Sequence, residues 1–442
     1  MKHPKLVIVG AGSIFFTRAV AVGMCKDSRF RGGTLALVDT DPDMLDVMAR
    51  LCRRIIDQSG ADLTLEASCV RRQVLPGADF VVLSFSNKGV DLREVETQIP
   101  SRYGVRQSSG DTIGPGGLFR AIRTIPTVLE VARDIEHLCP DAWVFNYINP
   151  SPVIGLALAR YSRVRKTLAL CDGVLLPEKK HELMDRVGVP RERADEVIMR
   201  IGGINHFSWV TEFRLGKQDL FPRLLESLRQ KPEAHASRAV EQLLEVFGFY
   251  SAIAGHMVEF LPYFQGHGWR PEESYVSYVF EIDERRKWMR EFRNEVRRQA
   301  DGLDPIDRLI AETRPDLVIR IADSILDDSG DVHYVNFPNR GHITNLPDGA
   351  MVELPARQYA DRYEGEKFGE MPRVLRGWLL RVIDVQELTL EAAVTGDRRI
   401  LRQALVADPL TMSIEDADHI IEDLFSAEGE DIPALWRTDR RG

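Results

Sequence analysis

The beginning of the chain contains the pattern that most restricts its fold, a strand, a glycine turn and a helix. Residues 6–9 form a short apolar run, a Gly-Ala-Gly-Ser turn follows at residues 10–13, and residues 34–38 form a second apolar run. Three further apolar runs, separated by segments of helical character, occur at residues 80–85, 143–147 and 167–170. Continuous apolar strands joined by helices are typical of a parallel sheet that is covered on both faces. We therefore predict a Rossmann-like, doubly wound α/β fold for this part of the chain.

The pattern changes in the second half of the chain. Helical segments dominate there, and strand-like runs interrupt them at residues 197–201, 208–213 and 332–336. The final helices are predicted over residues 373–405, with a break near Gly396, and over residues 413–425. We predict a dinucleotide-binding domain over residues 1–195. A mixed α/β, helix-rich domain over residues 196–442 would then contribute the substrate, metal and oligomerisation surfaces.

Composition and charge exclude several classes of protein. The chain is 44% hydrophobic and 28% charged, which is ordinary for a globular protein. Its 58 Lys and Arg against 67 Asp and Glu give a formal net charge of −9, and no long basic run offsets it, which argues against nucleic acid and anionic lipid as partners. No stretch approaches the ~20 apolar residues of a membrane span, and the first apolar run is too short for a signal peptide. The five scattered cysteines fit reduced thiols, so we expect a cytoplasmic protein.

The glycine turn predicts a nucleotide-binding site. Gly10 and Gly12 would let the backbone approach a pyrophosphate at the N-terminus of the following helix, and Asp39 could accept hydrogen bonds from a ribose diol. A turn with only a structural role is the alternative, because Phe15 stands where the third glycine of G-x-G-x-x-G would be. The strand context and Asp39 favour the nucleotide. The residues that we predict to bind NAD are Gly10, Gly12, Ser13, Ile14, Phe15, Asp39 and Asn87.

Polar residues follow two of the predicted parallel strands. Asn149 comes after one strand, and Cys171 and Asp172 come after the next. Ligands of open parallel sheets bind beyond the carboxyl ends of the strands, so these side chains should face one crevice. An Asn-Pro turn and a core cysteine are the alternatives. His206 alone could be an ordinary core histidine, but together with Cys171 it would complete an N/S ligand set for a borderline divalent metal.

Two further segments carry polar residues that could face a ligand. Residues 110–117 contain four glycines and a proline, which predicts a loop with unusual backbone angles that could receive an oxygen-rich ligand near Asp111. A surface turn is the alternative. His256 and Glu259 are three residues apart and would share one face if their segment were helical, although it could also be an ordinary loop.

As a set, these motifs resemble family 4 of the glycoside hydrolases, the NAD- and manganese-dependent glycosidases. Each motif is weak by itself, but together they occur in the family's order over almost the whole chain, and jointly they are specific. They comprise Val-Gly-Ala-Gly-Ser at residues 9–13, Gly-Pro-Gly-Gly at 114–117 with Arg120 and Arg123, Asn149-Pro150, Cys171-Asp172, Asn205-His206, Pro-Asn-Arg-Gly at 338–341 and Ala-Asp-Pro-Leu at 407–410. The similarity in fold extends to lactate and malate dehydrogenases.

The resemblance implies a redox-assisted elimination, which is an exception to the two-carboxylate mechanism of most glycosidases. Bound NAD takes the hydride from sugar C3, and the resulting ketone acidifies the C2 proton, which a base removes while the metal stabilises the enediolate. The C1–O bond then breaks with acid assistance, water adds and the hydride returns, so that NAD is not consumed. Relatives are usually dimers or tetramers, so we expect a homodimer or homotetramer.

Residue by residue, the resemblance implies that Cys171 and His206 bind Mn²⁺ and that Asn149 binds the substrate. Asp172 stands where members that cleave uronides or galactosides typically have His, and it is similar to the acid of the phospho-enzymes that cleave α-glucosides. No Asp stands near residue 255, where some relatives have their base, so the base stays open among His256, Glu259, Tyr250 and Tyr263. The catalytic candidates are Asp172, His256 and Tyr263, and the substrate-binding candidates are Asn149, Asp111, Asn205 and Glu259.

One departure from the family's pattern bears on the substrate. Members that cleave phosphosugars carry an arginine just after the strand that corresponds to residues 80–85, whereas this chain has Ser-Phe-Ser-Asn-Lys at residues 84–88. We therefore predict an NAD- and Mn²⁺-dependent α-glycosidase that acts on a small, non-phosphorylated glucoside. The alternatives are the same mechanism on a 6-phospho-α-glucoside, an α-galactoside or a uronide, a dehydrogenase with net NAD turnover, and a catalytically silent sugar or NAD sensor.

Overall fold

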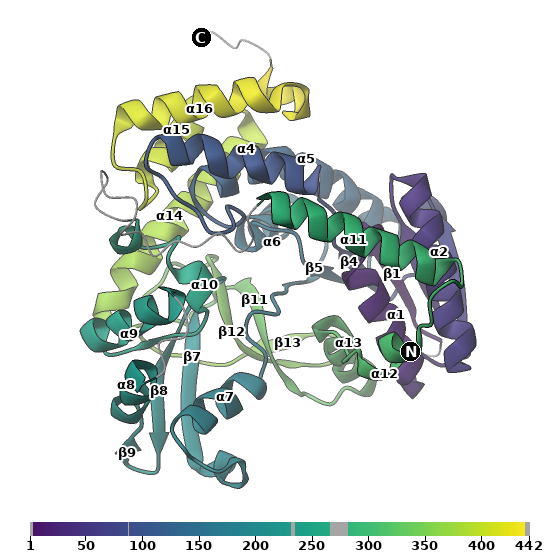
Figure 1. The fold of residues 1–442 in the computed structure, drawn as a ribbon, viewed down its shortest axis with the longest axis horizontal. Helices are drawn as coiled ribbons and strands as arrows, with labels where there is room; N and C mark the ends of the chain where they lie inside the picture. The colour runs from purple at the N-terminus through teal and green to yellow at the C-terminus, as the bar shows by residue number, and fades with distance from the viewer. Residues whose placement is uncertain (1–2, 87, 231–234, 266–281, 438–442) are drawn as a thin grey trace.

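The computed structural model describes residues 3–86, 88–230, 235–265 and 282–437, and its strands form one long mixed sheet (Figure 1). Six neighbouring strands are parallel: β1 (Lys5–Val9), β2 (Gly33–Val38), β3 (Leu63–Ser68), β4 (Phe80–Leu83), β5 (Trp143–Asn146) and β6 (Lys166–Ala169). They lie in the order β3-β2-β1-β4-β5-β6. This is the order of a dinucleotide-binding fold, with its switch point between β1 and β4. The Rossmann-like prediction is confirmed.

The helices between these strands follow from local sequence. They are α1 (Phe16–Lys26), α2 (Pro42–Ser59), α3 (Arg71–Val74), α4 (Gly89–Arg102), α5 (Gly114–Leu138) and α6 (Ser151–Tyr161). In α2, the Asp41 side chain accepts hydrogen bonds from the first-turn amides, and Gly60 ends the helix in the left-handed conformation. Sequence analysis did not predict β3, because this edge strand alternates polar and apolar residues and has no continuous apolar run.

The glycine-rich segment is helical over more of its length than we predicted. We expected a loop over residues 110–117, but Gly114 already begins α5. The helix passes very close to the preceding backbone, because a Cβ on Gly116 would lie 2.6 Å from the carbonyl oxygen of Gly110. Two of the glycines therefore serve close packing at the start of a helix, and only Gly110 and Gly114 have the positive φ expected of a turn.

The second half of the chain extends the same sheet with antiparallel strands. They are β7 (Val197–Ile204), β8 (Phe207–Leu215), β9 (Gln218–Asp219), β10 (Tyr250–Ser251), β11 (Val332–Pro338), β12 (Met351–Gln358) and β13 (Tyr363–Gly365). The junction with the parallel part is β11 against β6, where Asn336 pairs with Ala169. The sheet is therefore continuous across the predicted domain boundary near residue 195.

Helices from the second half pack back on the first (Figure 1). The helices that follow β6 are α7 (Glu178–Arg186), α8 (Phe221–Gln230), α9 (His235–Phe247), α10 (Ala254–Met257), α11 (Ile282–Ala300), α12 (Asp307–Glu312), α13 (Leu317–Asp327), α14 (Arg373–Thr395), α15 (Arg398–Ala407) and α16 (Ile414–Glu428). α11 lies along α2, α13 contacts α1, and α14 contacts α5. The predicted break at Gly396 is confirmed, since this glycine ends α14 with a φ of 70°. Within the described ranges, no helix has the length and apolar character needed to cross a bilayer.

Candidate active site

The glycine turn after β1 is held by the neighbouring strand and by a carboxylate. The amides of Gly10 and Ala11 both donate to the carbonyl oxygen of Val38 at 2.8 Å, and the amide of Gly12 donates to Oδ2 of Asp39 at 2.7 Å. Gly10 has a φ of 98°, and a Cβ there would lie 2.6 Å from the amide nitrogen of Phe85. A Cβ on Gly12 would lie 2.9 Å from the Asp39 carboxylate. Both glycines are therefore needed for the backbone to turn this tightly.

This turn opens into a cleft of about 1040 Å³, at the upper end of small-molecule sites. Gly10, Gly12, Ser13 and Asp39 line it, as predicted for a nucleotide. Two predicted cofactor residues have other surroundings: the Ile14 side chain is buried in the core, and Phe15 stacks on two aromatic rings of α11. Asn87 lies outside the described residues.

The α11 helix also lines the cleft, which the sequence did not indicate. Phe15 stacks on Phe292 with ring centroids 4.1 Å apart and on Trp288 at 4.8 Å. The next face of the helix presents Arg290 and Arg293 to the cleft, and within the described ranges neither arginine forms an ion pair. Two cations without a protein partner suit an anionic ligand such as a pyrophosphate. The one feature in the sequence that could have indicated this role is the spacing of Arg290 and Arg293, which are three residues apart on a predicted helix.

Cys171 and His206 lie together, as the sequence predicted. Cys171 follows β6, and His206 lies in the tight turn between β7 and β8, with its Nε2 at 3.2 Å from the Cys171 sulfur. His206 has a φ of 63°, a left-handed conformation in which His is tolerated better than most residues. Thr112 contacts its other ring nitrogen, Nδ1, at 2.8 Å and thereby orients the ring.

The surroundings of this pair favour metal binding. Burial and the adjacent His256 ring lower the pKa of His206 to about 3, so that its imidazole is neutral near pH 7. Burial, with the nearby carboxylates of Glu353 and Asp172, raises the pKa of the Cys171 thiol well above its ordinary value. A bound cation would have the opposite effect on a thiol and hold it as the thiolate.

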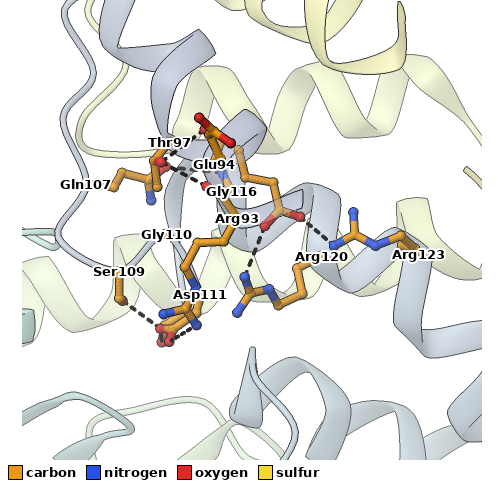
Figure 2. Close-up of polar contacts among 12 residues, drawn as sticks. Arg93, Glu94, Thr97, Gln107, Ser109, Gly110, Asp111, Gly116, Arg120 and Arg123 are labelled. Carbon is orange, nitrogen blue, oxygen red and sulfur yellow. Dashed lines mark hydrogen bonds and ion pairs between the residues drawn. The ribbon is translucent and has the colours of Figure 1, made fainter. Parts of the chain in front are cut away.

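Asp111 and His256 join the same cluster. Ligand atoms of Asp111, His206 and His256 all lie within 4.8 Å of one another, and the two imidazole rings stack with centroids 4.0 Å apart. Asp111 accepts a hydrogen bond from Ser109 Oγ at 2.8 Å and pairs with Arg93 at 3.3 Å (Figure 2). Burial acts to raise the pKa of Asp111, but Arg93 and the two histidines outweigh it and hold this pKa well below its usual range.

The remaining predicted residues lie at different distances from this cluster. Glu259 is buried and accepts hydrogen bonds from the backbone amides of Ser109 and Gly110, so it holds the loop that carries Asp111. Tyr263 is 58% exposed and packs edge-on against Trp378, and no contact among the described residues joins it to the histidines. Tyr250, by contrast, is buried in the small hydrophobic core of the second half.

Asn149, Asp172 and Asn205 follow strand ends of the sheet. The Asn149 side chain accepts a hydrogen bond from the amide of Ser151 at 3.2 Å and so begins α6. Asp172 is exposed and lies beside Cys171; burial raises the pKa of the half-buried Tyr147 hydroxyl, and Asp172 is close enough to raise it further electrostatically. Asn205 is fully buried, and its amide nitrogen donates to Glu353 at 3.1 Å, while its oxygen has no partner among the described residues.

Arg120 and Arg123, which belong to the recognised glycine motif, have a structural partner. Both arginines form ion pairs with the fully buried Glu96 of α4, at 3.0 and 2.6 Å. Arg123 also pairs with Glu428 of α16. This network joins α4, α5 and α16 behind the Asp111 loop, so it supports the site without lining it.

Comparison with known proteins covers almost the whole chain. The family model described as family 4 glycosyl hydrolase matches residues 5–185, and the model of its C-terminal domain matches residues 201–411. An α-galactosidase of Bacillus subtilis is 30% identical over 436 residues, which are 97% of this chain and 99% of that protein. The crystal structure of Bacillus subtilis LplD superposes with a TM-score of 0.84 at 27% identity, covering 96% of this chain and 100% of that one. A 6-phospho-α-glucosidase from gut microorganisms, solved in complex with NAD and Mn²⁺, has a TM-score of 0.81 at 19% identity, covering 98% and 99% of the two chains.

Proposed function

Since the chain belongs to family 4 of the glycosyl hydrolases, we propose that it cleaves a small, non-phosphorylated α-glycoside with the help of bound NAD and Mn²⁺. The observation that carries the proposal is the convergence of Cys171 and His206 at the carboxyl edge of the sheet. Cys171 follows the last parallel strand and His206 lies in the first antiparallel hairpin, on either side of the predicted domain boundary near residue 195.

The residues of the site fit both a divalent cation and a dinucleotide. At a zinc ion, whose bonds to sulfur and nitrogen are near 2.3 and 2.1 Å, the two ligand atoms lie about 3.1–3.6 Å apart, and the larger Mn²⁺ needs a similar or slightly longer separation. The observed separation of the Cys171 sulfur and His206 Nε2 is 3.2 Å. The glycine turn, Asp39 and the two free arginines of α11 suit the pyrophosphate and ribose of a dinucleotide. When bound, NAD supplies reversible hydride acceptance and the cation supplies Lewis acidity beside the reacting carbons.

The chain's own side chains would move the protons. His256 stacks on His206 and contacts Ser109, so it lies beside the cation site and is our candidate for the base that removes the proton from sugar C2. Asp172 is exposed on the same strand end as Cys171 and is our candidate for the acid that protonates the leaving oxygen. Tyr263 stays the second candidate for the base, and it would have to move toward the histidines to act.

The charges near β4 favour a sugar without a phosphate. Lys88 is the cation that stands nearest to the family's phosphate-binding position, and its ammonium group already pairs with Asp431 at 2.7 Å. A 6-phosphate would have to break this pair. Within non-phosphorylated sugars, Asp172 favours an α-glucoside, whereas the relative that is 30% identical is an α-galactosidase, so an α-galactoside is the second candidate.

A panel of p-nitrophenyl glycosides tests the proposal. The α-glucoside, its 6-phosphate, the α-galactoside and the α-galacturonide would each be incubated with and without NAD, Mn²⁺ and a thiol reductant. We expect release of p-nitrophenol from the free α-glucoside only when NAD and Mn²⁺ are present, without net NADH. Exclusive cleavage of the phosphorylated sugar would overturn the choice of substrate. Steady accumulation of NADH without aglycone release would instead indicate a dehydrogenase.

A further inference from the structure

Glu353 of β12 is a buried carboxylate whose partners are all uncharged. Its side chain is 1% exposed, and it accepts hydrogen bonds from Asn205 Nδ2 at 3.1 Å, Asn336 Nδ2 at 3.1 Å and Ser208 Oγ at 2.5 Å. Within the described ranges, no Lys, Arg or His forms an ion pair with it. An ionised carboxylate in such a place is costly unless a positive charge compensates it.

The position of Glu353 in the sheet is also unusual. Val352 and Leu354, its neighbours on β12, are buried apolar residues, as expected for a strand in the middle of a sheet. An apolar residue at position 353 would satisfy the same strand geometry without the desolvation of a charge. The carboxylate therefore calls for a function outside the packing of the core.

The hydrogen bonds of Glu353 lead to both predicted metal ligands. Asn205 immediately precedes His206 in the tight β7–β8 turn. Asn336 donates to Glu353 and also to the carbonyl oxygen of Ala169 at 3.2 Å, on the strand that ends just before Cys171. The carboxylate is close enough to Cys171 to act on it electrostatically. One side chain thus connects the two segments that carry the sulfur and the imidazole.

We propose that Glu353 is the buried counter-charge of the divalent cation held by Cys171 and His206, and that it positions His206 through Asn205. This inference rests on the proposed function, because it needs a cation at that pair. A thiolate at Cys171 and a carboxylate at Glu353 together balance the two positive charges of the ion, since the carboxylate of Asp111 is already paired with Arg93 and the imidazole of His206 is neutral. Conversely, the ion supplies the positive charge that the buried carboxylate lacks in the protein.

The variant Glu353→Gln separates charge from shape. The amide oxygen can keep the two hydrogen bonds from Asn205 and Asn336, and its NH₂ group can donate to Ser208 Oγ. The Ser208 hydroxyl still has an acceptor, because it lies 3.2 Å from the carbonyl oxygen of Ile204. The three hydrogen bonds of the wild-type side chain therefore keep a donor and an acceptor in the variant, and the negative charge is lost.

Two measurements on the purified full chain test the proposal: Mn²⁺ binding, followed by electron paramagnetic resonance of the free ion, and the melting temperature in EDTA and in Mn²⁺. We expect Glu353→Gln to raise the Kd for Mn²⁺ by about 10- to 100-fold, as for other residues behind a metal ligand. Its melting temperature in EDTA should equal or exceed that of the wild type, because a buried unpaired charge is gone. The rise in melting temperature on addition of Mn²⁺ should shrink accordingly.

Two control variants identify the origin of the effect. Ser208→Ala removes one hydrogen bond and keeps the charge, so its Kd for Mn²⁺ should stay within about twofold of the wild type while the melting temperature falls slightly. Asp134→Asn neutralises another buried carboxylate, one that pairs with Arg71 and Arg72 in the nucleotide half. It should lower the melting temperature without changing the affinity for Mn²⁺.

Three results would overturn the proposal. A Glu353→Gln protein that binds Mn²⁺ within twofold of the wild type would show that the charge is irrelevant to the ion. A variant that fails to fold, or melts earlier in EDTA, would make Glu353 a structural residue. Equal loss of Mn²⁺ affinity in Ser208→Ala would assign the effect to hydrogen bonding. A wild-type chain that binds no Mn²⁺ would remove the proposed cation site as well, so the two failures are distinguishable.

Discussion

Glu96 and Glu353 are both buried carboxylates next to the active site, but they are compensated in different ways. Glu96 on α4 is fully buried between Arg120 and Arg123, so two cations of the protein itself neutralise it (Figure 2). Glu353 on β12 has two amides and one hydroxyl around it and no charged partner among the described residues.

This difference distinguishes a buried carboxylate that stabilises the fold from one that, in our proposal, serves the active site. An ion pair that is complete within the protein can hold helices together in any state of the enzyme, and the Glu96 network does so for α4, α5 and α16. A buried carboxylate with only dipoles around it is compensated in part, and it retains an attraction for a cation from solution. The same residue type therefore supports the fold at one position and, in our proposal, a cofactor at the other.

The largest expected effect comes from removing the cation site beside Glu353. Cys171→Ser should abolish detectable Mn²⁺ binding and lower the rate of glycoside cleavage by about 1000-fold or more, because a Lewis acid contributes several kcal/mol to such a reaction. Cys25→Ser, at a half-buried cysteine of α1 that does not line the nucleotide cleft, should change neither quantity. Adding Glu353→Gln to Cys171→Ser should raise the melting temperature of the single variant, since the carboxylate can no longer gain a cation. A further fall in the melting temperature would contradict the view that Glu353, unlike Glu96, lacks a counter-charge within the protein.

The second-largest expected effect is on stability, and it tests the role of Glu96. Glu96→Gln leaves the buried Arg120 guanidinium without its ion-pair partner and Arg123 with Glu428 alone, so the free energy of unfolding should fall by about 3–5 kcal/mol. Urea denaturation followed by circular dichroism measures this change. The matched control is Glu387→Gln, which breaks the surface pair of Glu387 with Arg160 and should change stability by about 1 kcal/mol or less. Similar losses in the two variants would show that the Glu96 network is no stronger than a surface pair.

A smaller effect is expected at Asp172, an exposed carboxylate beside the metal ligand. If Asp172 protonates the leaving oxygen, Asp172→Asn should lower kcat/KM for a disaccharide by about 100-fold and leave a nitrophenyl glycoside nearly unchanged, because nitrophenolate leaves without a proton. The affinity for Mn²⁺ should stay as in the wild type, unlike that of Glu353→Gln. Equal losses with both substrates would remove Asp172 from the role of acid.

The smallest effect concerns Asp39, a carboxylate whose partners are backbone amides. It accepts hydrogen bonds from the amides of Gly12 and Asp41 at 2.7 and 3.0 Å. Asp39→Asn removes the charge that repels a 2′-phosphate, together with one of the two hydrogen bonds from backbone amides, so the preference for NAD over NADP should fall roughly tenfold, or about 1.4 kcal/mol. Titration of the two dinucleotides by intrinsic fluorescence measures it. Asp43→Asn, in the exposed first turn of α2, should leave the preference intact.

Local sequence accounted for most of the parallel half. The apolar runs that we predicted as strands correspond to β1, β2, β4, β5 and β6, since a strand buried on both faces needs continuous apolar residues. The edge strand β3 was not predicted because one of its faces meets solvent. The predicted loop at residues 110–117 was partly wrong, because the close approach of two backbone segments, which only glycine permits, cannot be told from a flexible turn in sequence.

The candidate site was also predicted only in part from the sequence. The pairing of Cys171 with His206 was inferred from two strand ends and the family resemblance. In the structure, the Cys171 sulfur lies 3.2 Å from Nε2 of His206. Asp111 and His256 were predicted as substrate-binding and catalytic candidates, but their closeness to His206 was not predicted, because it depends on how the Asp111 loop and α10 pack in the tertiary structure. Arg290 and Arg293 were likewise missed, since nothing local indicates that α11 returns to the nucleotide cleft.

The amino-acid sequence by itself determined the parallel sheet, the glycine turn and the residue types available for a metal and a dinucleotide, because periodicity, turn chemistry and ligand chemistry are local properties. Only the tertiary structure decided which charges are compensated. Whether a buried carboxylate meets arginines, as Glu96 does, or amides, as Glu353 does, depends on contacts between segments that lie far apart in the chain. Desolvation and Coulomb interactions act through space, and the linear order of residues does not record these distances.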